Sequence, residues 1–202
     1  MTRDQRYTVR LEALQKAPWK RWLGVQLPYR WNLRRLRPGF TLDVGCGLGR
    51  NLAHLDGAGV GIDHNPHSVA ACTSAGLVAF LPDDFCRSRY NRPGTFDSLL
   101  VSHVAEHMLR SEFIGLLRTY VPVLREAGRI IVITPQEAGF RSDPTHVEFV
   151  DQEAIRTALD AVGFAPVRQY SFPFPRTAGR LFRYNEFVCV GRRRVPPGEA
   201  KT

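Results

Sequence analysis

From about residue 40 onward, the chain alternates short apolar stretches with amphipathic ones. Apolar stretches of strand length, bounded by turn-forming or polar residues, predict β-strands at 40–44, 59–63, 96–102, 129–134 and 187–190. Amphipathic stretches predict a helix beginning near Asn51 and further helices at about 66–75, 111–125 and 151–162. This alternation favours an α/β fold, a mostly parallel sheet with helices on both faces.

The first 37 residues differ from this pattern and predict a separate helical element. They contain all three tryptophans of the chain, Trp19, Trp22 and Trp31. Tyr29, Leu33 and Leu36 share one face of a helix, so we expect a basic, Trp-rich cap or dimerisation element that buries its aromatic side chains. We therefore divide the chain into this element (1–37), the α/β domain (38–194) and a flexible tail (195–202).

The charge distribution follows the same division. The net charge is +9, yet residues 1–37 carry ten cations against two acids, whereas residues 38–187 carry fourteen arginines and sixteen acids. A basic patch can bind nucleic acid, so an RNA-binding arm is the alternative interpretation of residues 1–37. The nearly neutral body does not itself favour a nucleic-acid partner.

The sequence also indicates the cellular compartment and the chemical role of the cysteines. No apolar run reaches the roughly 18 residues of a membrane span, and the N-terminus lacks the apolar stretch of a secretory signal. Four cysteines, none in a C-x-x-C pair, favour small buried residues over a zinc ribbon or a disulfide framework. We expect a cytoplasmic protein without a membrane partner.

A glycine-rich loop follows the first predicted strand directly. The sequence Asp43-Val-Gly-Cys-Gly-Leu-Gly49 joins that strand to a helix, which is the setting of a nucleotide-binding loop. The dinucleotide fingerprint needs a glycine where this chain has Arg50, which argues against a hydride-transferring enzyme.

This D-x-G-x-G-x-G loop, with Asp63 ending the second predicted strand, resembles the class I S-adenosylmethionine (SAM) methyltransferase family from about Phe40 to Val190. The resemblance implies a Rossmann-like sheet of seven strands, mostly parallel with an antiparallel last strand, and SAM as the methyl donor. The positions it implies for SAM binding are Asp43, Gly45, Gly47, Gly49, Asp63, His64, Asp84, Phe85, Ser102 and His103.

Three of these implied roles concern the donor's methionine and ribose. Gly45 and Gly47 would face the methionine moiety, and Asp43 would lie on the side of its amino group. Asp63 would accept hydrogen bonds from both ribose hydroxyls, since one carboxylate can accept two at once.

The implied adenine contact lies in the segment before the strand predicted at 96–102. Asp84 would bind the exocyclic amine and Phe85 would contact the base through its backbone. The neighbouring Asp83 is an alternative to Asp84.

Methyl transfer needs an aligned acceptor and a group that removes its proton. His146 is the first choice of general base because the family often places a histidine in this loop, with Asp143 or Glu148 as the group that orients it. His107 is a second catalytic candidate. A purely structural histidine remains the alternative for each position.

The segment from His103 to His107 also spells H-x-x-E-H, a zinc-protease pattern, but its position after a central strand matches a Glu-His pair that methyltransferases often carry. A metal held by these histidines, by His146 or by carboxylates stays open. Oxygen ligands such as Asp143 and Glu148 would suit Mg²⁺.

Several residues suggest which acceptor is methylated. The chain lacks the Asn/Asp-Pro-Pro-Tyr and Pro-Cys motifs of base methylation, and its three lysines all lie outside the domain core. The segment 172–186 is rich in aromatic and hydrogen-bonding side chains, which suit a carbohydrate, although a solvated hairpin is the alternative. Its candidate substrate contacts are Arg176, Arg180, Tyr184 and Glu186.

The basic start, the glycine loop and the FPFPR to YNEF tail together resemble actinobacterial sugar O-methyltransferases of methylmannose polysaccharide synthesis. That resemblance implies O-methylation of a sugar or small oligosaccharide at the 1-hydroxyl of a methylated mannoside, with Mg²⁺ assistance. The amphipathic N-terminal segment separately predicts a homodimer contact. The alternatives are an RNA methyltransferase that uses its basic arm and a SAM-binding protein without turnover.

Overall fold

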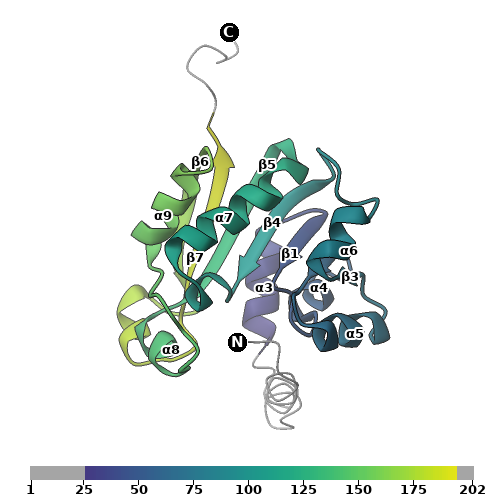
Figure 1. Cartoon of the computed structure of the whole chain (residues 1–202). Coiled ribbons are helices and arrows are strands. Elements are labelled where there is room, and N and C mark those ends of the chain that lie inside the picture. The colour runs from purple at the N-terminus through teal and green to yellow at the C-terminus, as the bar shows by residue number, and fades with distance from the viewer. Residues whose placement is uncertain (1–25, 195–202) are drawn as a thin grey trace. The chain divides into compact units, whose positions relative to one another are not determined.

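The computed structural model describes residues 26–194 (Figure 1). The chain divides into two compact units, residues 1–92 and 93–202. The seven strands of its mixed sheet run in the order β3-β2-β1 in the first unit and β4-β5-β7-β6 in the second. The expected α/β class, with mostly parallel strands and an antiparallel last strand, is confirmed.

The N-terminal unit is a parallel three-stranded layer with short helices. Strand β1 pairs with β2 in a register that places Asp43 opposite Gly61, and β2 pairs with β3. Its elements are α3 (Leu27–Arg35), β1 (Thr41–Val44), α4 (Arg50–His54), β2 (Gly59–Ile62), α5 (Pro66–Ser74), β3 (Ala79–Phe80) and α6 (Pro82–Arg87). The two residues of β3 are too few to produce a sequence signal.

The loop after β1 packs closely on β2 because β2 contains glycine. A Cβ on Gly61 would lie 2.6 Å from Cys46 Sγ, so any larger residue would push the loop away. Cys46 and Cys72 are buried with Leu52 beneath the loop, as expected for small buried cysteines, whereas Cys86 is exposed and corrects that expectation.

Helix α3 confirms the predicted helix for the part that the structure describes. Leu33 and Leu36 are buried, whereas Trp31 is 56% exposed with the Arg35 guanidinium over its ring. The expected burial of the aromatic side chains therefore does not extend to Trp31 within the chain. Trp19 and Trp22 lie outside the described residues, and the cap, the RNA arm and the three-part division stay predictions.

The C-terminal unit is a four-stranded mixed layer. Strand β5 is parallel to β4, and β7 is antiparallel to both β5 and β6. Helix α9 packs on β6 and β7 and lies beside α7 (Figure 1). Its elements are β4 (Phe96–Ser102), η1 (Ala105–His107), α7 (Arg110–Tyr120), η2 (Val121–Val123), β5 (Leu124–Pro135), α8 (Glu137–Arg141), α9 (Gln152–Asp160), β6 (Phe164–Phe172), η3 (Arg176–Arg180) and β7 (Glu186–Arg193).

In this unit one predicted helix ends earlier than expected, and one strand has no counterpart among the predicted strands. The helix expected to reach residue 125 ends at Tyr120, where Pro122 follows in η2, and β5 already begins at Leu124. Strand β6 was not predicted because it lies at the sheet edge and exposes polar side chains such as Arg168 and Gln169, which leaves little apolar alternation.

Buried amides anchor the segment between β6 and β7. Gln136 donates to Ser171 Oγ (2.8 Å) and accepts from Asn185 Nδ2 (3.0 Å), and Asn185 Oδ1 accepts from the Phe174 backbone (2.9 Å). Gly179 packs directly on this network, because a Cβ there would lie 1.7 Å from Gln136 Oε1. The segment is thus fastened to the end of β5 rather than being a loose hairpin.

No helix in the described part of the chain has both the length and the apolar character needed to cross a bilayer.

Gly179→Ala should lower the free energy of unfolding by about 2 kcal/mol, because the new methyl group must displace Gln136 from its hydrogen bonds. Gly115→Ala is the matched control, since its Cβ meets nothing within 4 Å and alanine favours the helix by about 1 kcal/mol. Urea unfolding measures both. Equal stability of the Gly179→Ala variant and the wild type would contradict the packing described here.

Candidate active site

The glycine loop between β1 and α4 has the backbone conformation that its sequence predicts. Gly45, Gly47 and Gly49 have φ angles of 74°, 53° and 76°, which side chains with a Cβ rarely adopt. Around Gly47 a Cβ would meet nothing within 4 Å, so this side of the loop is open to a ligand. At Gly49 a Cβ would lie 2.5 Å from Leu77 Cδ1, so glycine is needed here for close packing within the protein rather than for access of a ligand.

Asp63 fixes the loop from the end of β2. Its Oδ2 accepts the Gly47 N–H and its Oδ1 accepts the Asn65 N–H, both at 2.8 Å. The residue is only 8% exposed, and its two oxygens keep further lone pairs for hydroxyl donors. His64 beside it is exposed, with Nδ1 3.8 Å from Asp63 Oδ1. The ribose role implied for Asp63 is therefore compatible with its structural one.

Asp43 presents a buried carboxylate oxygen that has no partner. The residue is fully buried, its Oδ1 accepts weakly from Asn51 Nδ2 (3.4 Å), and its Oδ2 has no hydrogen-bond partner. Burial raises the pKa of Asp43 to about 7, against the opposing effect of Asn51. An unpartnered buried carboxylate suits a cationic group of a ligand, such as the amino group of SAM.

The residues implied for the adenine contact lie in α6. Asp84 pairs with Arg87 (2.8 Å), and the Phe85 N–H donates to Leu81 O (2.9 Å) within α6, so both groups implied by the resemblance are already engaged. Asp83, the alternative, lies exposed in the first turn of the same helix. Both carboxylates are exposed, and Asp84, with Asp83 as its alternative, stays a prediction for the adenine contact.

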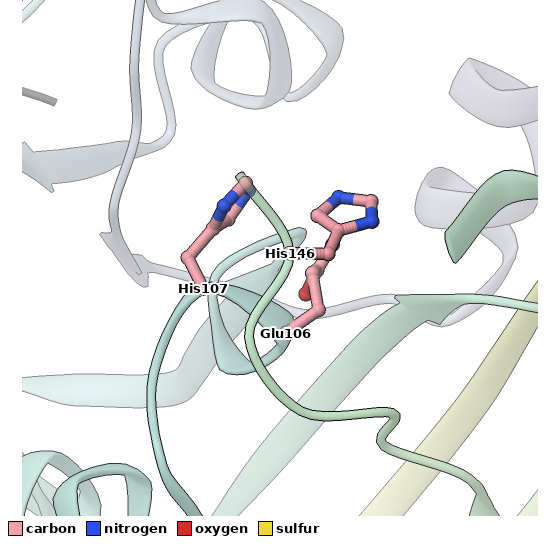
Figure 2. Close-up of side chains that lie close together, drawn as sticks. All are labelled: Glu106, His107 and His146. Carbon is pink, nitrogen blue, oxygen red and sulfur yellow. The ribbon is translucent and has the colours of Figure 1, made fainter. Parts of the chain in front are cut away.

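In the C-terminal unit, Glu106, His107 and His146 converge from the turn after β4 and the loop after α8 (Figure 2). His146 Nδ1 donates to the Phe140 carbonyl (2.7 Å), and its ring stacks on the Phe140 ring at 5.2 Å. His107 Nδ1 lies 3.3 Å from the Thr145 carbonyl. A donor at Nδ1 leaves each Nε2 as an unprotonated acceptor in the neutral ring.

The carboxylates expected to orient His146 have other partners. Asp143 Oδ1 accepts from the backbone and hydroxyl of Thr145 (3.0 and 2.8 Å), and Glu148 pairs with Arg110 (3.0 Å). The Phe140 carbonyl holds His146 Nδ1, and no sequence motif marks this carbonyl. Asp143 acts on the site through Thr145, whose hydroxyl is 3.2 Å from His107 Nδ1.

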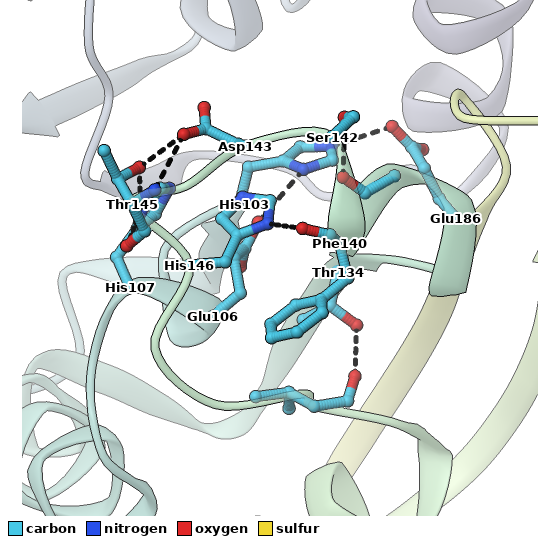
Figure 3. Close-up of polar contacts among 12 residues, drawn as sticks. His103, Glu106, His107, Thr134, Phe140, Ser142, Asp143, Thr145, His146 and Glu186 are labelled. Carbon is cyan, nitrogen blue, oxygen red and sulfur yellow. Dashed lines mark hydrogen bonds and ion pairs between the residues drawn. The ribbon is translucent and has the colours of Figure 1, made fainter.

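His103 bridges two buried carboxylates (Figure 3). It follows Ser102, the buried last residue of β4, with a left-handed φ of 58°, and its ring nitrogens lie 3.2 Å from Glu106 Oε1 and 2.8 Å from Glu186 Oε1. Burial lowers its pKa, but the hydrogen bonds to Glu106 and Glu186 outweigh burial and raise the pKa to about 9. His103 is therefore an imidazolium at neutral pH.

This pairing changes how two predicted residues are understood. Glu186, proposed as a substrate contact, is 8% exposed and engaged with His103, and His103 itself lies within an ion-pair network. Sequence reasoning missed Glu106 as the partner of His103, although its i, i+3 spacing in the H-x-x-E-H pattern was the available signal.

Three exposed aromatic side chains flank η3: Phe174 precedes it, and Phe182 and Tyr184 follow it. The rings of Phe174 and Phe182 lie 5.2 Å apart, and those of Phe182 and Tyr184 lie 5.7 Å apart, all three partly exposed. Of the predicted substrate residues, Tyr184 belongs to this cluster and Arg180 is exposed beside it, whereas Arg176 forms a two-point ion pair with Glu137.

Comparison with known proteins agrees with this architecture. Residues 42–132 match the family model described as a methyltransferase domain. No curated protein matches the sequence.

Three solved structures illustrate the fold. A SAM-dependent methyltransferase from Archaeoglobus fulgidus is 20% identical over 82% of this chain and 93% of its own, with a TM-score of 0.65. Magnesium protoporphyrin IX methyltransferase from Synechocystis PCC 6803 with bound S-adenosylhomocysteine (SAH) is 15% identical. The match covers 93% of this chain and 99% of its own, with a TM-score of 0.60. The 1,6-didemethyltoxoflavin-N1-methyltransferase of Burkholderia thailandensis is 19% identical. The match covers 93% of this chain and 88% of its own, with a TM-score of 0.59.

The match of residues 42–132 to a methyltransferase domain supports a SAM-dependent methyltransferase and agrees with the geometry of the glycine loop. The structural neighbours show the shared fold, and their named substrates differ from one another. The shared fold therefore does not determine the acceptor of this chain, which depends on the residues of its own site.

The His103 network gives a testable pH dependence. Because the folded pKa of about 9 exceeds the ordinary value of 6.5, its stabilisation is complete below about pH 6.5 and is lost as pH rises through 9. His103→Gln should cost about 3 kcal/mol of unfolding free energy near pH 6.5, because two buried carboxylates lose their cation. In urea unfolding, this cost should shrink towards pH 10. A cost independent of pH, or one matched by the exposed His67→Gln control, would refute the network's charge state.

Proposed function

We propose that this chain is a SAM-dependent O-methyltransferase that methylates a hydroxyl of a sugar or small oligosaccharide, with His146 as general base. The observation that carries the proposal is the fixed His146 ring, whose Nδ1 is held 2.7 Å from the Phe140 carbonyl so that Nε2 is the proton acceptor. Such an imidazole suits proton removal from a hydroxyl near neutral pH.

The N-terminal unit would hold the methyl donor. Asp43 Oδ2 would receive the methionine amino group, the open side of Gly47 would admit the methionine backbone, and Asp63 would accept from the ribose. When bound, SAM supplies an electrophilic methyl group on a sulfonium. The chain itself has to orient the acceptor and take its proton.

The aromatic cluster of Phe174, Phe182 and Tyr184 supports a carbohydrate acceptor. Sugars stack their C–H faces on aromatic rings, and the exposed Arg180 and Arg183 beside the cluster can bind hydroxyls. The 1-hydroxyl of a methylated mannoside is the favoured position, because an anomeric hydroxyl is the most acidic one of a sugar and is the easiest for a histidine to deprotonate.

Asp43→Asn tests the donor site. It should weaken SAM binding about 10- to 100-fold in calorimetry, because a buried charge-assisted hydrogen bond is lost. Wild-type affinity should rise from pH 6 to about 7.5 as Asp43, with its pKa of about 7, ionises, and the variant should show no such rise. Glu126→Gln, on an exposed position of β5, is the control. An Asp43→Asn variant with wild-type affinity would exclude this role.

His146→Gln tests the base. It should lower the transfer rate at least about 100-fold and leave SAM affinity within about twofold, with His67→Gln as control. The assay transfers tritiated methyl groups first to an extract separated into carbohydrate, lipid, protein and RNA, and then to mannosides with an open or blocked 1-hydroxyl. Label in RNA would favour the basic-arm alternative, and transfer to the blocked mannosides would exclude the 1-hydroxyl. An active His146→Gln variant would remove the base assignment.

A further inference from the structure

Glu106 carries the second unpartnered buried oxygen among the described residues. Its side chain is 1% exposed; Oε1 contacts His103, whereas Oε2 has no hydrogen-bond partner. A buried carboxylate oxygen left unpaired costs free energy, so its position indicates a cationic ligand. His103 Nδ1 lies 3.2 Å from Oε1, so Oε2 is the oxygen left for a further ligand.

Glu106 lies beside two histidines, and all three residues can supply metal ligands. One ligand atom each from Glu106, His107 and His146 can be chosen so that all three lie within 4.8 Å of one another (Figure 2). Ligands about 2.1 Å from a tetrahedral metal ion lie about 3.4 Å apart, so small side-chain rotations would complete the set. The two imidazole centroids are 4.8 Å apart, which places both rings beside one ion.

The hydrogen bonds of both histidines match those of metal-ligating imidazoles. His146 donates Nδ1–H to the Phe140 carbonyl, and His107 Nδ1 faces the carbonyl and hydroxyl of Thr145, whose own hydroxyl proton goes to Asp143 (Figure 3). Metal-binding histidines are commonly fixed in this way, with the second nitrogen directed at the ion. Asp143 thus belongs to the support of the site rather than to its ligands.

We propose that Glu106, His107 and His146 form a binding site for a divalent transition-metal ion of the Zn²⁺ type, with two imidazole ligands and one carboxylate. Two nitrogen ligands select Zn²⁺ or Co²⁺ over Mg²⁺, which prefers oxygen. Because the ion takes the His146 Nε2 lone pair, it excludes the action of His146 as a base and inhibits methyl transfer. This second statement rests on the proposed function, whereas the metal site does not.

The test of the site uses the full-length protein and the metal ions alone. Calorimetry should show one Zn²⁺ per chain, and Co²⁺ should give a visible absorption band of a low-coordinate nitrogen and oxygen site. His107→Asn should weaken Zn²⁺ binding at least about 10-fold and reduce the band, whereas His67→Asn should change neither. A 100-fold excess of Mg²⁺ should not displace Zn²⁺. Binding unaffected by His107→Asn and His146→Gln, or readily displaced by Mg²⁺, would overturn the site.

The inhibition is measured separately. Zn²⁺ at the concentration that fills the site should reduce methyl transfer at least about 10-fold, and chelation should restore it. Transfer that continues in the zinc-loaded enzyme would overturn the exclusion of the base and leave the binding result intact. If the wild type shows no transfer with any acceptor, the proposed function fails, while calorimetry and the Co²⁺ spectrum still decide the metal site.

Discussion

The burial of carboxylates is the constraint on which both units depend. Asp43 and Asp63 lie at the ends of β1 and β2, Glu106 lies in the turn after β4, and Glu186 opens β7, all of them nearly or fully buried. A buried charge must be paired with donors or cations, or its pKa must shift. The loops of each unit are arranged around this requirement, through Gly47 and Asn65 at Asp63 and through His103 at Glu106 and Glu186.

Where this pairing is incomplete, the structure indicates its ligands. Among the described residues, two buried side-chain oxygens lack a partner, Asp43 Oδ2 and Glu106 Oε2. Asp43 lies beside a glycine loop that is open at Gly47, and Glu106 lies beside two histidines. The two carboxylates therefore suit different cations: Asp43 suits an ammonium group of a small molecule, and Glu106 suits a metal ion.

The sequence predicts the parts of this arrangement that depend on local conformation. The glycines of the loop are required by their positive φ angles, and the buried strands 59–62 and 96–102 follow from apolar runs, so both could be recognised without a structure. Edge strand β6 could not, because its polar side chains face water. The orienting role of the Phe140 carbonyl could not either, since any residue supplies a carbonyl, and only the fold decides which one lies near His146.

A fixed imidazole is chemically ambiguous, and this ambiguity has consequences for the enzyme. The hydrogen bond that holds Nδ1 of His146 prepares Nε2 equally well for a proton and for a metal ion. What favours the metal is a second imidazole and an unpaired carboxylate oxygen within reach, and neither is needed for proton transfer by His146 alone. A carboxylate beside a general base also stabilises the imidazolium that forms, so Glu106 alone does not separate the two roles. The second imidazole does, because His107 offers a lone pair that a metal ion can bind and that proton transfer by His146 does not use.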